Sequence, residues 1–196
     1  MDRGRFESSI LDFPRRSRKE ASFVMRFTDH RWRSVATVLI ATAAVATAAG
    51  SRLPAAEIMA GNAAASAAAS ITADEAGRHV TALADDSFEG REAGSRGGRA
   101  AGSYIVDALD DLGLEPAGDG GTFYQPFGGM RNILALARGS DPAVANELVI
   151  VSAHYDHVGY GNAANSYGPT GFIHNGADDN ASGVAGLVEV AEAIQK

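Results

Sequence analysis

The chain contains no cysteine among its 196 residues. This absence excludes disulfide bonds, zinc sites built from thiolates, and a lipid-anchored cysteine at an export cleavage site. The absence of cysteine is compatible with any cellular compartment. A chain of this length suits a single domain.

The sequence also lacks an apolar run long enough to span a bilayer securely. Val35 to Ala49 is the candidate run, but it is short and rich in Ala and Thr, whereas a membrane helix needs about 20 apolar residues. Basic residues precede this run (Arg26, Arg31, Arg33), and the small residues Ala46 to Ala48 follow its apolar part. This order is typical of a secretory signal peptide. We therefore predict export to the periplasm or the extracellular space, with no stable membrane span.

The leader pattern also predicts how the chain is divided. Met25 is the more natural start, which makes residues 25–48 the signal peptide and residues 1–24 upstream sequence. Residues 1–56 are then the leader and the start of a linker, 57–70 an Ala-rich linker, and 71–196 the catalytic domain as far as it extends. An uncleaved membrane anchor is the alternative interpretation of the apolar run.

Positive charge is scarce beyond residue 56. Residues 57–196 carry seven Lys and Arg against nineteen Asp and Glu, whereas residues 1–56 carry ten against five. The basic part coincides with the leader, so it does not indicate a nucleic-acid-binding arm. Residues 86–98 contain several Gly and Arg but lack both the GK[ST] ending of a phosphate loop and the GxGxxG dinucleotide pattern. We therefore expect neither nucleic-acid nor nucleotide binding.

From Ile71 onward the sequence predicts an α/β fold. Thr72 to Glu75 fits a capping box at the start of a helix that ends near Ala84. Apolar residues at helical spacing predict two more helices, over 99–112 with Gly113 as its stop, and over 183–196. The last helix has a narrow polar stripe at Glu189, Glu192 and Lys196. Strands are predicted at 132–137 and 148–153, joined as a hairpin, with 148–151 buried on both faces.

Polar side chains gather where the second strand ends and where the last helix begins. Alternation along a strand places His154 and Asp156 on one face, with Tyr155 on the other. Asp178, Asp179 and Asn180 precede Ser182, a good N-cap for the helix. Open α/β sheets bind their ligands at the carboxyl ends of the strands. A divalent metal site is therefore one interpretation of these residues.

Two structural interpretations compete with the metal site. A His after a buried strand is often only hydrogen-bonded, and acidic residues before a helix often only cap it. The two clusters together favour the metal, because Asp156 is placed to fix the tautomer of His154. The connection between them, Val158 to Ala177, is also long for a compact domain, and such length usually signals function or disorder.

The motifs HYDHVG and NGADDNASG resemble the paired signature of bacterial zinc aminopeptidases. These are di-zinc exopeptidases, a group that includes aminopeptidase Y and relatives of glutamate carboxypeptidase. The similarity continues upstream through GREAGSRGGRAAGSYI, LGLEPAGDGGTFYQPF and RNILALARGSD, and so covers 71–196. It implies a three-layer mixed-sheet α/β fold and a peptide substrate, whose N-terminal bond is hydrolysed by a water activated by two Zn2+ ions.

The resemblance also implies residue roles. His154 resembles a ligand of one zinc ion and Asp156 the carboxylate that orients it, while Asp178 resembles the aspartate that bridges both ions. A cis peptide is implied between Asp178 and Asp179. The family's Glu-Glu pair, which contains the general base, has no counterpart in this chain. We therefore expect the N-terminal half of such an enzyme, truncated before the sheet is complete and inactive alone.

Two other function classes stay open. The same fold supports acyltransferases, cyclases and amide hydrolases, and a panel of aminoacyl and blocked substrates distinguishes these from aminopeptidases. The same fold also occurs in receptor-like proteins that do not catalyse a reaction, and an inactive fragment is the simplest form of this alternative.

Overall fold

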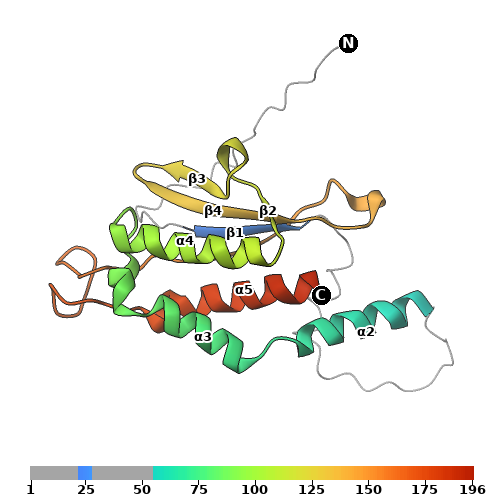
Figure 1. The fold of residues 1–196 in the computed structure, drawn as a ribbon, viewed down its shortest axis with the longest axis horizontal. Helices are drawn as coiled ribbons and strands as arrows, with labels where there is room; N and C mark the ends of the chain where they lie inside the picture. The colour runs from blue at the N-terminus through green and yellow to red at the C-terminus, as the bar shows by residue number, and fades with distance from the viewer. Residues whose placement is uncertain (1–21, 28–54) are drawn as a thin grey trace, which may run out of the picture.

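The computed structural model describes residues 22–27 and 55–196. These residues contain five strands and four α-helices, joined by loops and short helical turns. The helices lie on one side of the sheet (Figure 1). The strands are β1 (Ser22–Phe27), β2 (Glu115–Pro116), β3 (Tyr124–Phe127), β4 (Met130–Ala137) and β5 (Val149–His154). The helices are α2 (Ala55–Ala69), α3 (Ala73–Leu83), α4 (Arg96–Asp111) and α5 (Ser182–Gln195).

The sheet is mixed, with strand order β2-β4-β1-β5, and β3 also pairs with β4. Strand β1 runs parallel to β4, with Phe23 opposite Ile133, and antiparallel to β5, with Ser22 opposite His154. The predicted hairpin between the last two strands is therefore wrong, because β1 lies between them. Spacing within residues 132–153 carries no information about a strand contributed by a distant segment.

Strand β1 overlaps the predicted leader. Met25 to Phe27 lie in β1, while the apolar run Val35 to Ala49 lies outside the described residues. Within the described ranges, no helix combines the length and the apolar character needed to cross a membrane.

Local signals at the helix ends explain where α3 and α4 begin and stop. The predicted cap is confirmed for Thr72, whose hydroxyl accepts a hydrogen bond from the Glu75 N–H at 3.2 Å, but the Glu75 carboxylate accepts from the Thr72 hydroxyl at 2.7 Å rather than from its backbone N–H, so the capping box is incomplete. Helix α4 begins three residues earlier than predicted, since Ser95 caps it by accepting from the Gly98 N–H at 3.0 Å. Its predicted stop is confirmed at Gly113, whose φ of 75° suits a residue without a side chain.

The Ala-rich stretch that we predicted to be a linker forms helix α2 in the structure. Alanine has the highest helix propensity of all residues, so a run of it favours a helix even without an apolar stripe. Helix α2 contacts α5.

The core lies between α4, α5 and the sheet, with α3 packed on α5. The described helices and strands are compatible with the predicted α/β class, and the helices form one layer beside the sheet. The predicted burial of strand β5 on both faces is wrong, because Leu148, Val149 and Ile150 are exposed. Strand β5 lies at the edge of the described sheet, so nothing pairs with its outer side there. The fully buried aliphatic side chains include Leu83, Ile105, Leu109, Ile133 and Val184.

Glu189 departs from the predicted polar stripe of the last helix. Its side chain is 2 % exposed, and its Oε2 accepts a hydrogen bond from the Thr72 N–H at 3.4 Å. The helical period places Glu189 and Glu192 on the same face of α5, but the start of α3 covers Glu189. Glu189 therefore joins α5 to α3 rather than facing solvent.

Candidate metal centre

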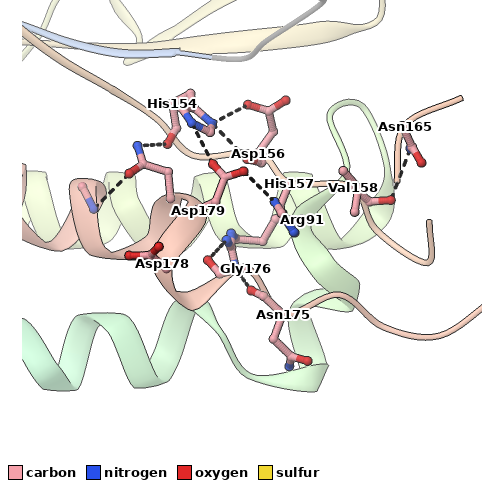
Figure 2. A network of polar contacts seen from close by, with 12 residues as sticks. Arg91, His154, Asp156, His157, Val158, Asn165, Asn175, Gly176, Asp178 and Asp179 are labelled. Atoms are coloured by element: carbon pink, nitrogen blue, oxygen red, sulfur yellow. Dashed lines mark hydrogen bonds and ion pairs between the residues drawn. The ribbon is translucent and has the colours of Figure 1, made fainter. Parts of the chain in front are cut away.

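His154 is the last residue of β5, and its two ring nitrogens face different partners. Nδ1 lies 3.1 Å from the backbone carbonyl oxygen of Asp156. A carbonyl can only accept, so this contact requires the proton on Nδ1. In the neutral ring Nε2 then carries the lone pair, and it faces the carboxylate of Asp179 at 3.1 Å (Figure 2).

Asp179 comes from the turn Ala177–Ala181, which precedes α5. Its Oδ1 lies 3.1 Å from His154 Nε2, and its Oδ2 lies 3.5 Å from His157 Nδ1. The turn is held in place by Asn180, which donates from Nδ2 to the His154 carbonyl at 3.1 Å. The turn thus brings the start of α5 to the end of β5.

Asp178 is not beside His154 in the structure. Its side chain is exposed, and its backbone carbonyl accepts from the Ser182 hydroxyl at 2.8 Å. Figure 2 shows its carboxylate apart from the histidines. The cis peptide also lies one residue later than the resemblance implied, between Asp179 and Asn180. Adjacent residues in a non-helical turn point in different directions, so a shift of one position changes which carboxylate reaches the histidine.

The predicted cap of the last helix is wrong in a related way. Ser182 lies inside α5 rather than before it. The Gly183 N–H instead donates a hydrogen bond to the Asn180 side-chain oxygen at 3.2 Å. The Asn180 side chain is therefore hydrogen-bonded both to the start of α5 and to the end of β5. The prediction of Ser182 as the cap did not include this role of Asn180.

Asp156 contacts His154 mainly through its backbone. The carboxylate Oδ1 is 3.6 Å from Nδ1, further than the carbonyl oxygen at 3.1 Å. The Asp156 side chain is buried, at 8 % residue exposure. In the structure, therefore, the backbone carbonyl of Asp156 makes the closer contact with the His154 ring, and its carboxylate the more distant one. Tyr155 turns the other way, into the core, and donates to the Arg131 carbonyl at 2.8 Å.

His157 lies beside the candidate site, with Nδ1 3.5 Å from Asp179 Oδ2, and was not among the residues predicted from the sequence. Burial lowers the pKa of its imidazole, and the nearby Asp179 carboxylate opposes this lowering. Its backbone N–H donates to the Arg91 carbonyl at 3.2 Å. The signal was present as the second His of HYDHVG, but strand alternation cannot place a residue after the strand has ended.

His154 Nε2 and Asp179 Oδ1 fit zinc in type and spacing. Both are acceptors when His154 is neutral, so they repel one another unless a proton or a metal ion lies between them. Two ligands of a tetrahedral zinc ion, with bonds of about 2.0–2.2 Å, are about 3.4 Å apart. Within 22–27 and 55–196, no group of three or more His, Cys, Asp or Glu is arranged to hold a metal. These residues thus supply two donors, fewer than a complete centre requires.

Comparison with known proteins points to the same region. Residues 132–196, about a third of the chain, match the sequence model of Peptidase family M28, a zinc aminopeptidase and carboxypeptidase-like family. No curated protein and no solved structure matches the chain. The matched segment contains both β5 and the turn with Asp179. The predicted resemblance to zinc exopeptidases is thereby confirmed for this part of the chain.

Proposed function

We propose, from the match of residues 132–196 to peptidase family M28, that this chain carries part of the metal centre of a zinc-dependent aminopeptidase. The observation that carries the proposal is the 3.1 Å approach of His154 Nε2 to Asp179 Oδ1. The two residues come from segments 25 positions apart in sequence, and they converge where α/β folds bind ligands. We also propose the three-layer exopeptidase fold for the complete enzyme.

In this proposal Asp179 takes the bridging role that the sequence reasoning gave to Asp178. The two oxygens of Asp179 face different partners, Oδ1 toward His154 and Oδ2 toward His157. A carboxylate arranged in this way is suited to contact two ions. The side chains of Asp178 and Asp179 are both exposed, but the Asp178 carboxylate lies apart from the histidines (Figure 2).

His154 would bind through Nε2 because the Asp156 carbonyl holds the proton on Nδ1. The metal, when bound, supplies a water activated for attack on a peptide carbonyl. Asn180 keeps the two donors together by tying the turn to the strand. We propose that the remaining ligands and the general base come from outside the described residues.

Zinc binding to the 196-residue chain tests this proposal. We expect measurable but weak binding in calorimetric titration, because a hydrolytic centre requires about three protein ligands and two are brought together here. His154→Ala should remove it, and a chelator should reverse it. Hydrolysis of aminoacyl anilides should be absent. Zinc binding unchanged by His154→Ala, or hydrolysis that survives loss of Asp179, would show that the site lies elsewhere.

The two-donor set also favours a second candidate, a non-catalytic relative with an incomplete centre. Zinc titration and the hydrolysis assay, run on a protein in which the remaining ligands are present, separate the two candidates. An enzyme then gains zinc affinity and hydrolytic activity together. A receptor-like protein shows no hydrolytic activity.

We further propose that the chain is exported through the leader at residues 25–48. Expression from Met25 in a secreting host should give a product cut near Ala48. N-terminal sequencing of the exported protein measures the cleavage point. A mature product that retains Val35 to Ala49 would contradict export by cleavage and support a membrane anchor.

A further inference from the structure

Arg91 is a buried cation that the proposed chemistry does not use. It lies at the end of the short helical turn Asp86–Arg91, and its side chain is among the largest that are fully buried, at 1 % exposure. Long charged side chains are rarely buried to this degree unless they are paired or fully hydrogen-bonded. Burial lowers the pKa of its guanidinium, and the Asp156 and Asp179 carboxylates counteract this lowering.

The Arg91 guanidinium donates hydrogen bonds to four backbone carbonyl groups. Nε donates to the Tyr155 oxygen at 3.0 Å, and Nη2 donates to the Gly176 oxygen at 2.8 Å. Nη1 donates to the oxygens of Leu83 and Asn175 at 2.5 Å each. Figure 2 shows the Arg91 guanidinium beside Gly176 and Asn175, joined to their carbonyl oxygens.

These carbonyls belong to three separate segments. Tyr155 directly follows His154, whereas Asn175 and Gly176 precede the turn that holds Asp179. Leu83 is the last residue of α3. A single planar side chain therefore fixes both donor segments to each other and to a helix of the core.

The backbone around Arg91 is shaped for this position. Glu89, Gly90 and Arg91 all have positive φ, at 51°, 66° and 51°. Such a conformation is unfavourable for a residue with a side chain, and strain of this kind concentrates at functional sites. A Cβ on Gly90 would lie 2.5 Å from the Gly159 carbonyl oxygen and 2.6 Å from that of His174. The turn is thus pressed against the loop that follows His157.

We propose that Arg91 is a positioning residue that sets the separation of His154 Nε2 and Asp179 Oδ1, an inference that rests on the proposed function. The guanidinium holds both segments by their main chain, so it fixes where each donor starts without contacting a metal or a substrate itself. Lysine cannot replace it, because an ammonium group lacks the rigid fork that reaches four carbonyls in fixed directions.

Arg91→Lys and Arg91→Met in the full chain test this inference, with Arg138→Lys as the matched control. The Arg138 side chain is exposed and pairs with Glu115 at 2.7 Å, at β2 and the end of β4 rather than at the site. Zinc affinity is measured by competition with an indicator dye, coordination geometry by the visible spectrum of bound Co2+, and folding by thermal unfolding. We expect Arg91→Lys to remain folded, to bind zinc about 10–100-fold more weakly, and to show an altered Co2+ spectrum. Arg138→Lys should match the unmodified chain in all three measurements.

Two outcomes overturn the inference. One is an Arg91→Lys protein with unchanged zinc affinity and an unchanged Co2+ spectrum. The other is loss of cooperative unfolding in both Arg91 variants, which would assign Arg91 to overall stability instead of to the donor pair. The proposed function fails separately, when His154→Ala leaves zinc binding unchanged. A chain that needs His154 but tolerates Arg91→Lys retains the proposed function and loses only this inference.

Discussion

Asp179→Asn should lower the zinc affinity of the chain by about 100-fold or more, because it removes a proposed ligand, whereas loss of a residue that only supports a ligand costs about 10–100-fold. The substitution keeps the side chain nearly the same size and removes its charge. Asp179 Oδ1 is the atom that faces His154 Nε2 at 3.1 Å. Calorimetric titration of zinc into the purified chain measures the effect.

Asp178→Asn is the matched control for this experiment. It makes the same chemical change one residue earlier, on a side chain that is also exposed but whose carboxylate lies apart from the histidines (Figure 2). We expect its zinc affinity to stay within about threefold of the unmodified chain, as for a surface group away from the ligands. The reverse order of effects would restore Asp178 as the ligand and contradict the geometry of the turn. Circular dichroism of both variants checks that the fold is retained.

Gly97→Ala should destabilise the protein by about 3 kcal/mol, at the upper end of the usual cost of overpacking. A Cβ at this position would lie 2.0 Å from the Phe88 carbonyl oxygen and 2.9 Å from the Glu89 Cβ. The first contact is with backbone, so no side-chain rotation relieves it. Either α4 or the turn Asp86–Arg91 must move. Urea unfolding measures the loss in free energy of unfolding.

Gly77→Ala is the same chemical change, but we expect it to raise rather than lower the free energy of unfolding. Gly77 lies within α3, and no atom lies within 4 Å of a Cβ built there. Alanine should therefore stabilise the helix by about 0.5–1 kcal/mol, because glycine loses more backbone entropy on folding. Equal effects of the two substitutions would contradict the close packing of α4 on the turn.

Features that depend on neighbouring residues were predictable from the sequence. The Thr72 cap and the Gly113 stop follow from interactions within one helical turn, and both are confirmed. The strands around Ile133 and Val151 follow from local apolar patterning. The candidate site residues at the end of β5 and before α5 were likewise singled out by local signals, the end of an apolar strand and an acidic run before a helix.

Features that depend on distant segments were not predictable. The choice between Asp178 and Asp179 depends on a non-helical turn, where no periodicity says which side chain faces the strand. Arg91 resembled any arginine in a Gly-containing turn, since its burial is created by carbonyl groups up to 85 residues away. The burial of Glu189 likewise depends on the start of α3 covering a helix face that looks polar in sequence.

The position of β1 means that cleavage of the leader and the sheet order described above are mutually exclusive. A start at Met25 omits Ser22 to Val24 and cleavage near Ala48 removes Met25 to Phe27, so the mature protein would lack β1 and have a gap one strand wide between β4 and β5. Neighbouring strands are about 4.8 Å apart, so closing the gap requires a lateral shift of about that distance. The two flanking strands already run antiparallel, and Ile133 and Ala153 share the same partner in β1. The exported protein would therefore acquire its final strand pairing only after processing, with His154 on a strand that has changed its neighbour.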